Sequence, residues 1–181
     1  MSSSAAAMNQ FLAGIEKRAY GMARIAVGNS EDALDIVQNS MLMLVRKYAH
    51  KPEPEWAPIF YRILQNTITD FHRKRARHRK LFFRGSFRDS DGEAEDVAEL
   101  HAGRASDEPE RRSLLDAASG HLMDSLAALP KRQQQAFMLR AWEGLSVADT
   151  ATSMRCSSGS VKTHYSRAVH RLRELLGDHW S

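Results

Sequence analysis

The residues best suited to chemistry in this sequence are cations and hydroxyls between Arg155 and Arg173, a stretch that contains no acidic residue. Hydroxyl, ammonium and guanidinium groups donate hydrogen bonds to the phosphate oxygens and base edges of DNA. The lack of carboxylates removes the groups that would repel phosphate. The segment therefore predicts a DNA-binding surface, with these candidate contacts: Ser160, Lys162, Thr163, Ser166, Arg167 and Arg171.

Two predicted helices would position these side chains. Ser146 is a suitable N-cap for the first helix, and a polar turn over residues 155–158 precedes the second. In the second helix, apolar residues recur at helical spacing and predict one buried stripe, made of Val161, Tyr165, Ala168, Leu172 and Leu175. The pair is typical of a helix-turn-helix whose second helix enters the major groove of DNA. A helical hairpin with a solvated basic face would share this pattern.

A second basic region follows Pro58, which suits the first turn of a helix. That helix is predicted to bury Phe60, Ile63, Thr67 and Phe71. It leads into a run over residues 71–88 that holds eight Lys or Arg, no acid, and several interleaved aromatics. Such a run fits the backbone or the unpaired bases of DNA, whereas most charge runs are only solvated surface. The outer face of the helix carries Arg62, Asn66, Asp70, Arg73 and Arg77.

The segment before this region predicts a helix over residues 30–48 with two kinds of surface. Its core stripe is predicted to be Leu34, Val37, Met41, Leu44 and Tyr48. A separate acidic and polar face holds Glu31, Asp32, Asp35, Gln38 and Asn39. Ile36 and Met43 are predicted to lie away from the core stripe, beside the acidic face. This combination indicates either a docking surface for another protein or a second contact within the same domain.

Composition limits the class of protein further. The chain has 181 residues, a net charge of +4 and few Gly or Pro, which favours helices. One cysteine excludes an internal disulfide and a multi-cysteine zinc site, and the eight His are scattered without metal-ligand spacing. We therefore expect no metal, no cofactor, no small-molecule substrate and no enzyme activity. The first residues lack a signal-peptide pattern, and no apolar stretch is long enough to span a membrane, so a cytoplasmic location is expected.

The order of these segments predicts an all-α chain of two small helical domains. Residues 1–8 are expected to be a disordered tail, and residues 9–80 the first domain. Residues 81–112 are expected to be a flexible linker, because residues 89–110 carry nine Asp or Glu against one Arg and few large apolar residues. Residues 113–181 are expected to form the helix-turn-helix domain.

Both domains resemble one known family, the bacterial extracytoplasmic-function sigma factors of RNA polymerase. The C-terminal part is similar to the family's promoter-recognition domain through Leu129-Pro130, Gly144-Leu145-Ser146, Ala151, Cys156, Gly159, Val161-Lys162, Arg167-Ala168 and Arg171-Leu172. The N-terminal part is similar to the core-binding domain through Glu31-Asp32-Ala33, Asp35-Ile36-Val37-Gln38, Trp56, Arg62, Ile63, Asn66, Asp70 and Arg73. The two similarities occur in the family's order and cover most of the chain.

The resemblance implies a partner for each surface. Asp32, Asp35, Ile36 and Gln38 would bind core RNA polymerase. The promoter's minus-thirty-five element would be read by the second helix of the helix-turn-helix. An anti-sigma factor is a further expected partner. The competing hypothesis is a free-standing helix-turn-helix regulator with a sensing or dimerising N-terminal domain. The residues that the resemblance assigns to the minus-ten element are Asn66, Asp70, Arg73, Lys74, Arg75 and Arg77.

Three places depart from the family pattern. Asn39-Ser40 follows Gln38 where an acidic residue and a bulky apolar one are more usual. Thr150 stands where the family usually has Ile, and it is a poorer core residue. Arg155 stands where a glycine is typical, so the turn must avoid a left-handed residue or hold one under strain.

Overall fold

The computed structural model describes residues 2–84 and 114–177, and these residues contain helices and no strand. The predicted all-α fold with a C-terminal helix-turn-helix is confirmed. The N-terminal domain consists of α1 (Ser2–Val27), α2 (Ser30–Tyr48) and α3 (Glu53–Arg84). The C-terminal domain consists of α4 (Leu114–Ala127), α5 (Lys131–Phe137), the π-helical turn η1 (Met138–Trp142), α6 (Val147–Met154) and α7 (Ser158–Leu176).

The N-terminal domain packs three helices around one apolar core. Helix α1 ends because Gly28 takes a left-handed conformation, with φ of 76°. Asn29 then caps α2, where its side-chain oxygen accepts hydrogen bonds from the backbone N–H groups of Glu31 at 2.8 Å and Asp32 at 3.2 Å. These two acids lie in the first turn of α2, where the helix dipole favours anions. The short turn therefore sets α1 and α2 side by side.

Three predicted boundaries differ from the structure. The predicted disordered tail is helical from Ser2 onward, because alanines favour helix and Met8 is buried in the core. Helix α3 begins at Glu53, so Pro58 lies inside the helix and not in its first turn. The same helix extends to Arg84, past the predicted end of the domain at residue 80. The predicted acidic linker over residues 89–110 lies outside the described residues.

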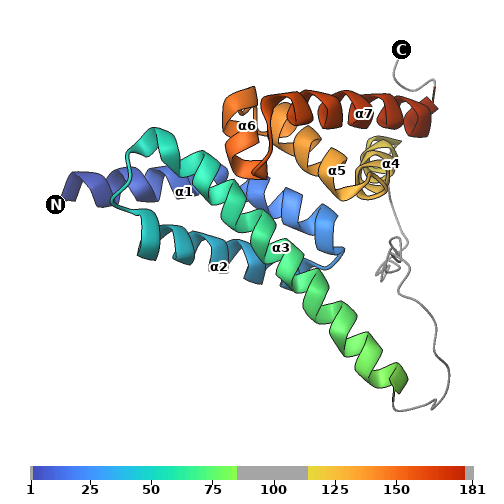
Figure 1. Cartoon of the computed structure of the whole chain (residues 1–181), viewed down its shortest axis with the longest axis horizontal. Coiled ribbons are helices and arrows are strands. Elements are labelled where there is room, and N and C mark those ends of the chain that lie inside the picture. The colour runs from blue at the N-terminus through green and yellow to red at the C-terminus, as the bar shows by residue number, and fades with distance from the viewer. Residues whose placement is uncertain (1, 85–113, 178–181) are drawn as a thin grey trace.

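The two domains pack directly against each other (Figure 1). Helix α6 contacts α3, and α4 contacts α1. As a result α3 is buried on two sides in its first half: Phe60 and Ile63 as predicted, but also Tyr61 and Leu64. The second half of α3 projects beyond the other helices in Figure 1. Five basic side chains of this part of the helix are exposed to solvent: Arg73, Lys74, Arg75, Arg77 and Arg79.

Candidate nucleic-acid and protein-binding surfaces

Helix α7 presents the predicted DNA-binding face to solvent. Ser157 caps it, with its hydroxyl oxygen accepting from the backbone N–H of Ser160 at 3.1 Å. The buried stripe is as predicted at Val161, Ala168 and Leu172, whereas Leu175 is partly exposed and Leu176 takes its buried place. The exposed candidates are Lys162, Thr163, Ser166, Arg167 and Arg171, while Ser160 is half-buried.

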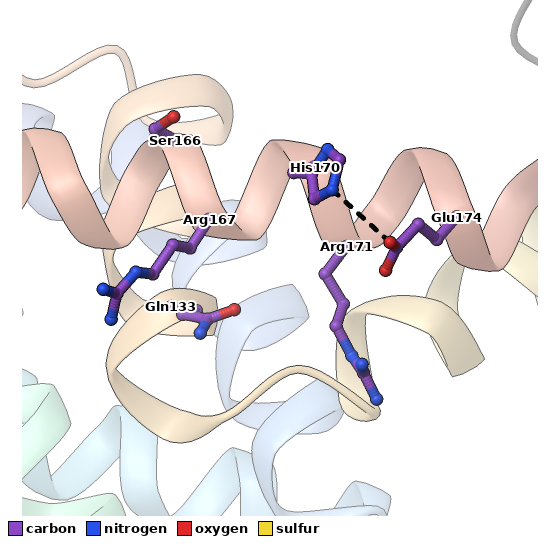
Figure 2. A pocket seen from close by; sticks show the side chains of 6 residues that line it. All are labelled: Gln133, Ser166, Arg167, His170, Arg171 and Glu174. Atoms are coloured by element: carbon purple, nitrogen blue, oxygen red, sulfur yellow. Dashed lines mark ion pairs between the residues drawn. The ribbon is translucent and has the colours of Figure 1, made fainter.

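An open hollow of about 400 Å³ lies between this face and α5. Figure 2 shows the Arg167 and Arg171 side chains extending from α7 toward the α5 side, with Gln133 between them. Further along α7, His170 Nε2 lies 3.4 Å from a Glu174 carboxylate oxygen. Two guanidinium groups that flank one concave surface suit an anionic backbone, because each can donate two parallel hydrogen bonds to a phosphate.

In the turn before α7, Arg155 takes the left-handed conformation, the strained one of the two alternatives predicted for it. Arg155 has φ of 51° and ψ of 51°, a left-handed conformation that costs a non-glycine residue about 1 kcal/mol. Its backbone N–H caps the end of α6 by donating to the carbonyls of Ala151 and Thr152. Thr150 is fully buried, and its hydroxyl donates to the carbonyl of Ser146 at 2.8 Å. A threonine can therefore occupy this core position, since its hydroxyl group is hydrogen-bonded within the helix.

Helix α3 carries the second basic surface. The candidates Asn66, Asp70, Arg73, Lys74, Arg75 and Arg77 are all exposed. Asp70 and Arg73 form an ion pair at 3.6 Å, so one carboxylate is partly neutralised within a surface that is otherwise cationic. Trp56, by contrast, is buried at the start of α3 and donates from Nε1 to the carbonyl of Lys51 at 2.9 Å. Its role in this structure is to anchor the α2–α3 connection.

His72 differs from the other basic residues of α3 because it is half-buried. It hydrogen-bonds to the backbone of Ala26 in α1. Burial, together with the nearby charge of Lys131 in α5, lowers the pKa of His72 below its ordinary value of 6.5. Arg75 and Arg79 act in the same direction. The imidazole is thus held neutral at the contact between α3 and α1.

The prediction for Ile36 in α2 is wrong. This side chain was expected beside the acidic face, but it is 4% exposed and belongs to the core. Leu34, expected in the core, is 48% exposed. The buried stripe of α2 includes Ser40, and because this residue is polar the sequence pattern did not reveal the stripe. The Ser40 hydroxyl donates a hydrogen bond to the carbonyl of Ile36 at 2.7 Å.

The exposed face of α2 is apolar and acidic together. Asp35 and Gln38 are exposed, as predicted, and Asp32 is half-buried. Leu42, at 51% exposure, was missed by the sequence reasoning, although its spacing of eight residues from Leu34 places both on one face. The exposed large apolar residues of this helix are Leu34, Leu42, Met43 and Val45. Such a gathering marks a surface that another protein can cover.

Comparisons with known proteins decide the family. Residues 120–172 match the family model described as Sigma-70, region 4. The RNA polymerase sigma-E factor of Streptomyces avermitilis is 30% identical over 155 residues, which cover 85% of this chain and 76% of that protein. The RNA polymerase sigma-H factor of Pseudomonas aeruginosa is 30% identical over 154 residues, which cover 83% of this chain and 76% of that protein.

The chain belongs to the bacterial extracytoplasmic-function sigma factors. The fold agrees with this assignment. The sigma factor RpoE, solved with the anti-sigma factor NepR from Bartonella quintana, matches with a TM-score of 0.65 and 24% identity over 94% of this chain and 97% of that one. CnrH, solved with the cytosolic domain of CnrY, matches with a TM-score of 0.62 and 18% identity over 97% of this chain and 90% of that one.

The two domains of this sigma factor meet at a polar contact that the sequence did not predict. Glu143, just after η1, accepts hydrogen bonds from the Arg18 guanidinium and the Tyr61 hydroxyl. Burial and this carboxylate raise the pKa of Tyr61, and the same carboxylate raises the pKa of Arg18. Both groups therefore remain protonated donors. Residues 2–84 and 114–177 contain no cluster of His, Cys, Asp or Glu that could hold a metal ion, and no helix within them could cross a membrane.

Proposed function

We propose that this sigma factor docks on core RNA polymerase through α2 and reads the minus-ten and minus-thirty-five promoter elements through α3 and α7. It would act in the cytoplasm as the specificity subunit of the polymerase, with no catalytic site of its own. The observation that carries this assignment is the exposure, in one chain, of one apolar and acidic face and two cationic faces. A protein partner suits the first face, and nucleic acid suits the other two.

The docking surface of α2 would consist of Leu34 and Leu42 together with Asp35 and Gln38. The exposed leucines supply apolar area that a partner can remove from water, worth roughly 25 cal/mol per Å². Asp35 and Gln38 beside them supply orientation and choice of partner. Asp32 contributes less, since it is half-buried and lies in the capped first turn of the helix.

The minus-ten element would bind along the outer face of α3. Asn66 offers an amide that can both donate to and accept from an unpaired base. The cations after it would contact the phosphates: Arg73 and Arg77 share the face of Asn66, and Lys74 and Arg75 lie on other faces of the same helix. These phosphate contacts come from Arg73, Lys74, Arg75 and Arg77.

The minus-thirty-five element would receive α7 in its major groove. Lys162, Thr163 and Ser166 lie on the exposed face where base edges can be read. Arg167 and Arg171, which flank the hollow beside α5, suit nearby bases and the DNA backbone. Neither DNA surface needs high affinity alone, because both would be attached to one polymerase and the second contact becomes intramolecular. An anti-sigma factor is a further proposed partner, since the structural relative RpoE was solved with one.

Run-off transcription with purified core polymerase on fragmented genomic DNA tests this function. New transcripts that depend on the added chain are expected, together with weak binding of the chain alone to the duplex promoters that they define. Tight binding of the chain alone to those promoters, with no polymerase-dependent transcript, would instead favour the free-standing regulator.

A further inference from the structure

One polar atom beside the hollow between α5 and α7 has no hydrogen-bond partner. The side-chain oxygen Oε1 of Gln133 is buried, and within residues 2–84 and 114–177 it is the one buried side-chain nitrogen or oxygen atom left unpaired. A buried acceptor without a donor destabilises a fold, because it has lost its hydrogen bonds to water and gained none. Such atoms are rare in folded proteins, so this one calls for an explanation.

The next residue of α5, Gln134, shows the ordinary arrangement. Its side chain is half-buried like that of Gln133, and its Nε2 group donates a hydrogen bond to the carbonyl of Leu126 at 2.8 Å. Gln134 thus fastens α5 to α4, which contains Leu126. Gln133 instead lines the hollow that α5 forms with α7. The two neighbouring glutamines therefore differ in pairing and in the helix that they face.

The donors closest to Gln133 in this hollow come from α7. Figure 2 shows the Ser166 hydroxyl turned away from Gln133, and the His170 imidazole paired with a carboxylate one turn further along α7. Two guanidinium groups remain, those of Arg167 and Arg171, and both side chains extend toward α5. The Gln133 oxygen points to the Arg171 side, whereas the Arg167 guanidinium lies on the opposite side (Figure 2). Arg171 is therefore the donor that best matches this oxygen.

An amide oxygen suits an arginine that must also hold a phosphate. The guanidinium of Arg171 has five N–H donors in a rigid plane, so one hydrogen bond to Gln133 leaves two parallel donors for a phosphate. Fixing the group before contact lowers the conformational entropy lost on binding. A carboxylate at this position would also fix the arginine, but it would neutralise the cation and repel the phosphate. The neutral glutamine leaves the positive charge available.

We propose that Gln133 is a positioning residue for Arg171, whose guanidinium donates to Gln133 Oε1 when promoter DNA binds and is thereby held against the DNA backbone. This inference rests on the proposed function, because it takes the minus-thirty-five element as the ligand of α7. In the free chain the oxygen stays unpaired, so the fold is less stable than with an apolar side chain at this position. Gln133 therefore exchanges stability of the free chain for affinity in the complex.

Thermal unfolding of the full chain tests the first half of this exchange. Gln133→Met removes the acceptor and nearly keeps the length of the side chain, so the midpoint should rise by about 2 °C or more. Gln134→Met is the matched control and should lower the midpoint, since it leaves the carbonyl of Leu126 without this donor. A lowered midpoint in Gln133→Met would show that its oxygen has a partner in the free chain, and would overturn the proposal.

Promoter binding by the chain in complex with core polymerase tests the second half. The probe is a promoter fragment identified by run-off transcription. Its apparent Kd should rise about fivefold or more in Gln133→Met and stay unchanged in Gln134→Met. A more stable fold that binds DNA less tightly cannot result from loss of structure. An unchanged Kd in Gln133→Met would overturn the proposal.

A double-mutant cycle identifies the arginine through which Gln133 acts. In an Arg171→Ala background, Gln133→Met should have little further effect on the Kd, because the group that it positions is gone. In an Arg167→Ala background, Gln133→Met should keep its full effect. Additive losses with Arg171→Ala would overturn the assignment.

The wild-type complex separates failure of this inference from failure of the proposed function. A wild-type chain that gives core polymerase no promoter binding would overturn both. Promoter binding by the wild type with the same Kd in Gln133→Met would overturn this inference alone.

Discussion

Helices α2 and α7 each contain 19 residues and bury one stripe against their own domain, yet they present opposite chemistry to solvent. The exposed face of α2 places Leu34 and Leu42 beside Asp35. The exposed face of α7 carries Lys162 and Arg167 beside short hydroxyl side chains. The first chemistry is suited to a protein partner and the second to DNA, so the proposed partner of each helix rests on its outward residues and not on the helical architecture.

The largest expected effect comes from Arg167→Ala in α7. Loss of a bidentate base or backbone contact costs about 1–3 kcal/mol, so transcription that depends on the minus-thirty-five element should fall by about tenfold or more. Association with core polymerase should not change, because α2 is untouched. Arg173→Ala, an exposed arginine on the same helix that does not line the hollow, is the control. Unchanged promoter use by the Arg167 variant would break the assignment of α7 to DNA.

The charge reversal Asp35→Arg in α2 should affect binding to core RNA polymerase. An arginine beside the apolar face replaces an attractive charge with a repulsive one, and the affinity for core polymerase should fall about tenfold. Pull-down with purified core polymerase measures this, with Glu16→Arg on the exposed side of α1 as the charge-matched control. Normal recovery of the polymerase with the Asp35 variant would count against α2 as the docking helix.

A smaller effect is expected from Arg73→Ala in α3. Removing one phosphate contact should lower the dependence of binding on salt by about 0.7 in the slope of log K against log salt for a single strand. The slope is measured for the polymerase-bound chain on a single-stranded minus-ten oligonucleotide. A slope identical to that of the wild type would show that Arg73 neutralises only Asp70, its ion-pair partner.

The smallest effect concerns His72, at the contact between α3 and α1. Its folded-state pKa lies below the ordinary 6.5, so the unfolded chain binds the proton first as pH falls. Stability is then complete above about pH 6.5 and is partly lost as pH falls toward the lowered pKa. As pH is lowered, the urea concentration at the midpoint of unfolding should fall less steeply in His72→Gln than in the control His78→Gln, which changes an exposed histidine of α3. Equal slopes would contradict the contribution of His72.

The sequence predicted the helix-turn-helix well because its signals are local. Ser146 and Ser157 cap the two helices through hydrogen bonds to residues three positions on. Val161, Ala168 and Leu172 repeat at a spacing that only a helix can bury on one side. The solvent-facing residues follow from the same periodicity, since they occupy the remaining faces.

Features that depend on distant partners could not be predicted in the same way. Ile36 was misplaced because the polar Ser40 interrupts the buried stripe, and its burial depends on packing and an internal hydrogen bond. Tyr61 is buried by a domain more than fifty residues away in the sequence. The π-helical turn at Met138–Trp142 has no periodic signal of its own. The packing of the two domains against each other therefore could not be predicted from local sequence patterns.

Run-off transcription at increasing concentrations of the chain tests the central assignment most directly, with wild type, Asp35→Arg and Arg167→Ala compared on one promoter. A high concentration should restore transcription by the Asp35 variant, because its defect is in association with the polymerase. The Arg167 variant should keep its lowered transcription at every concentration once the polymerase is saturated. Equal rescue of both variants, or no defect in either, would contradict the division of partners between α2 and α7.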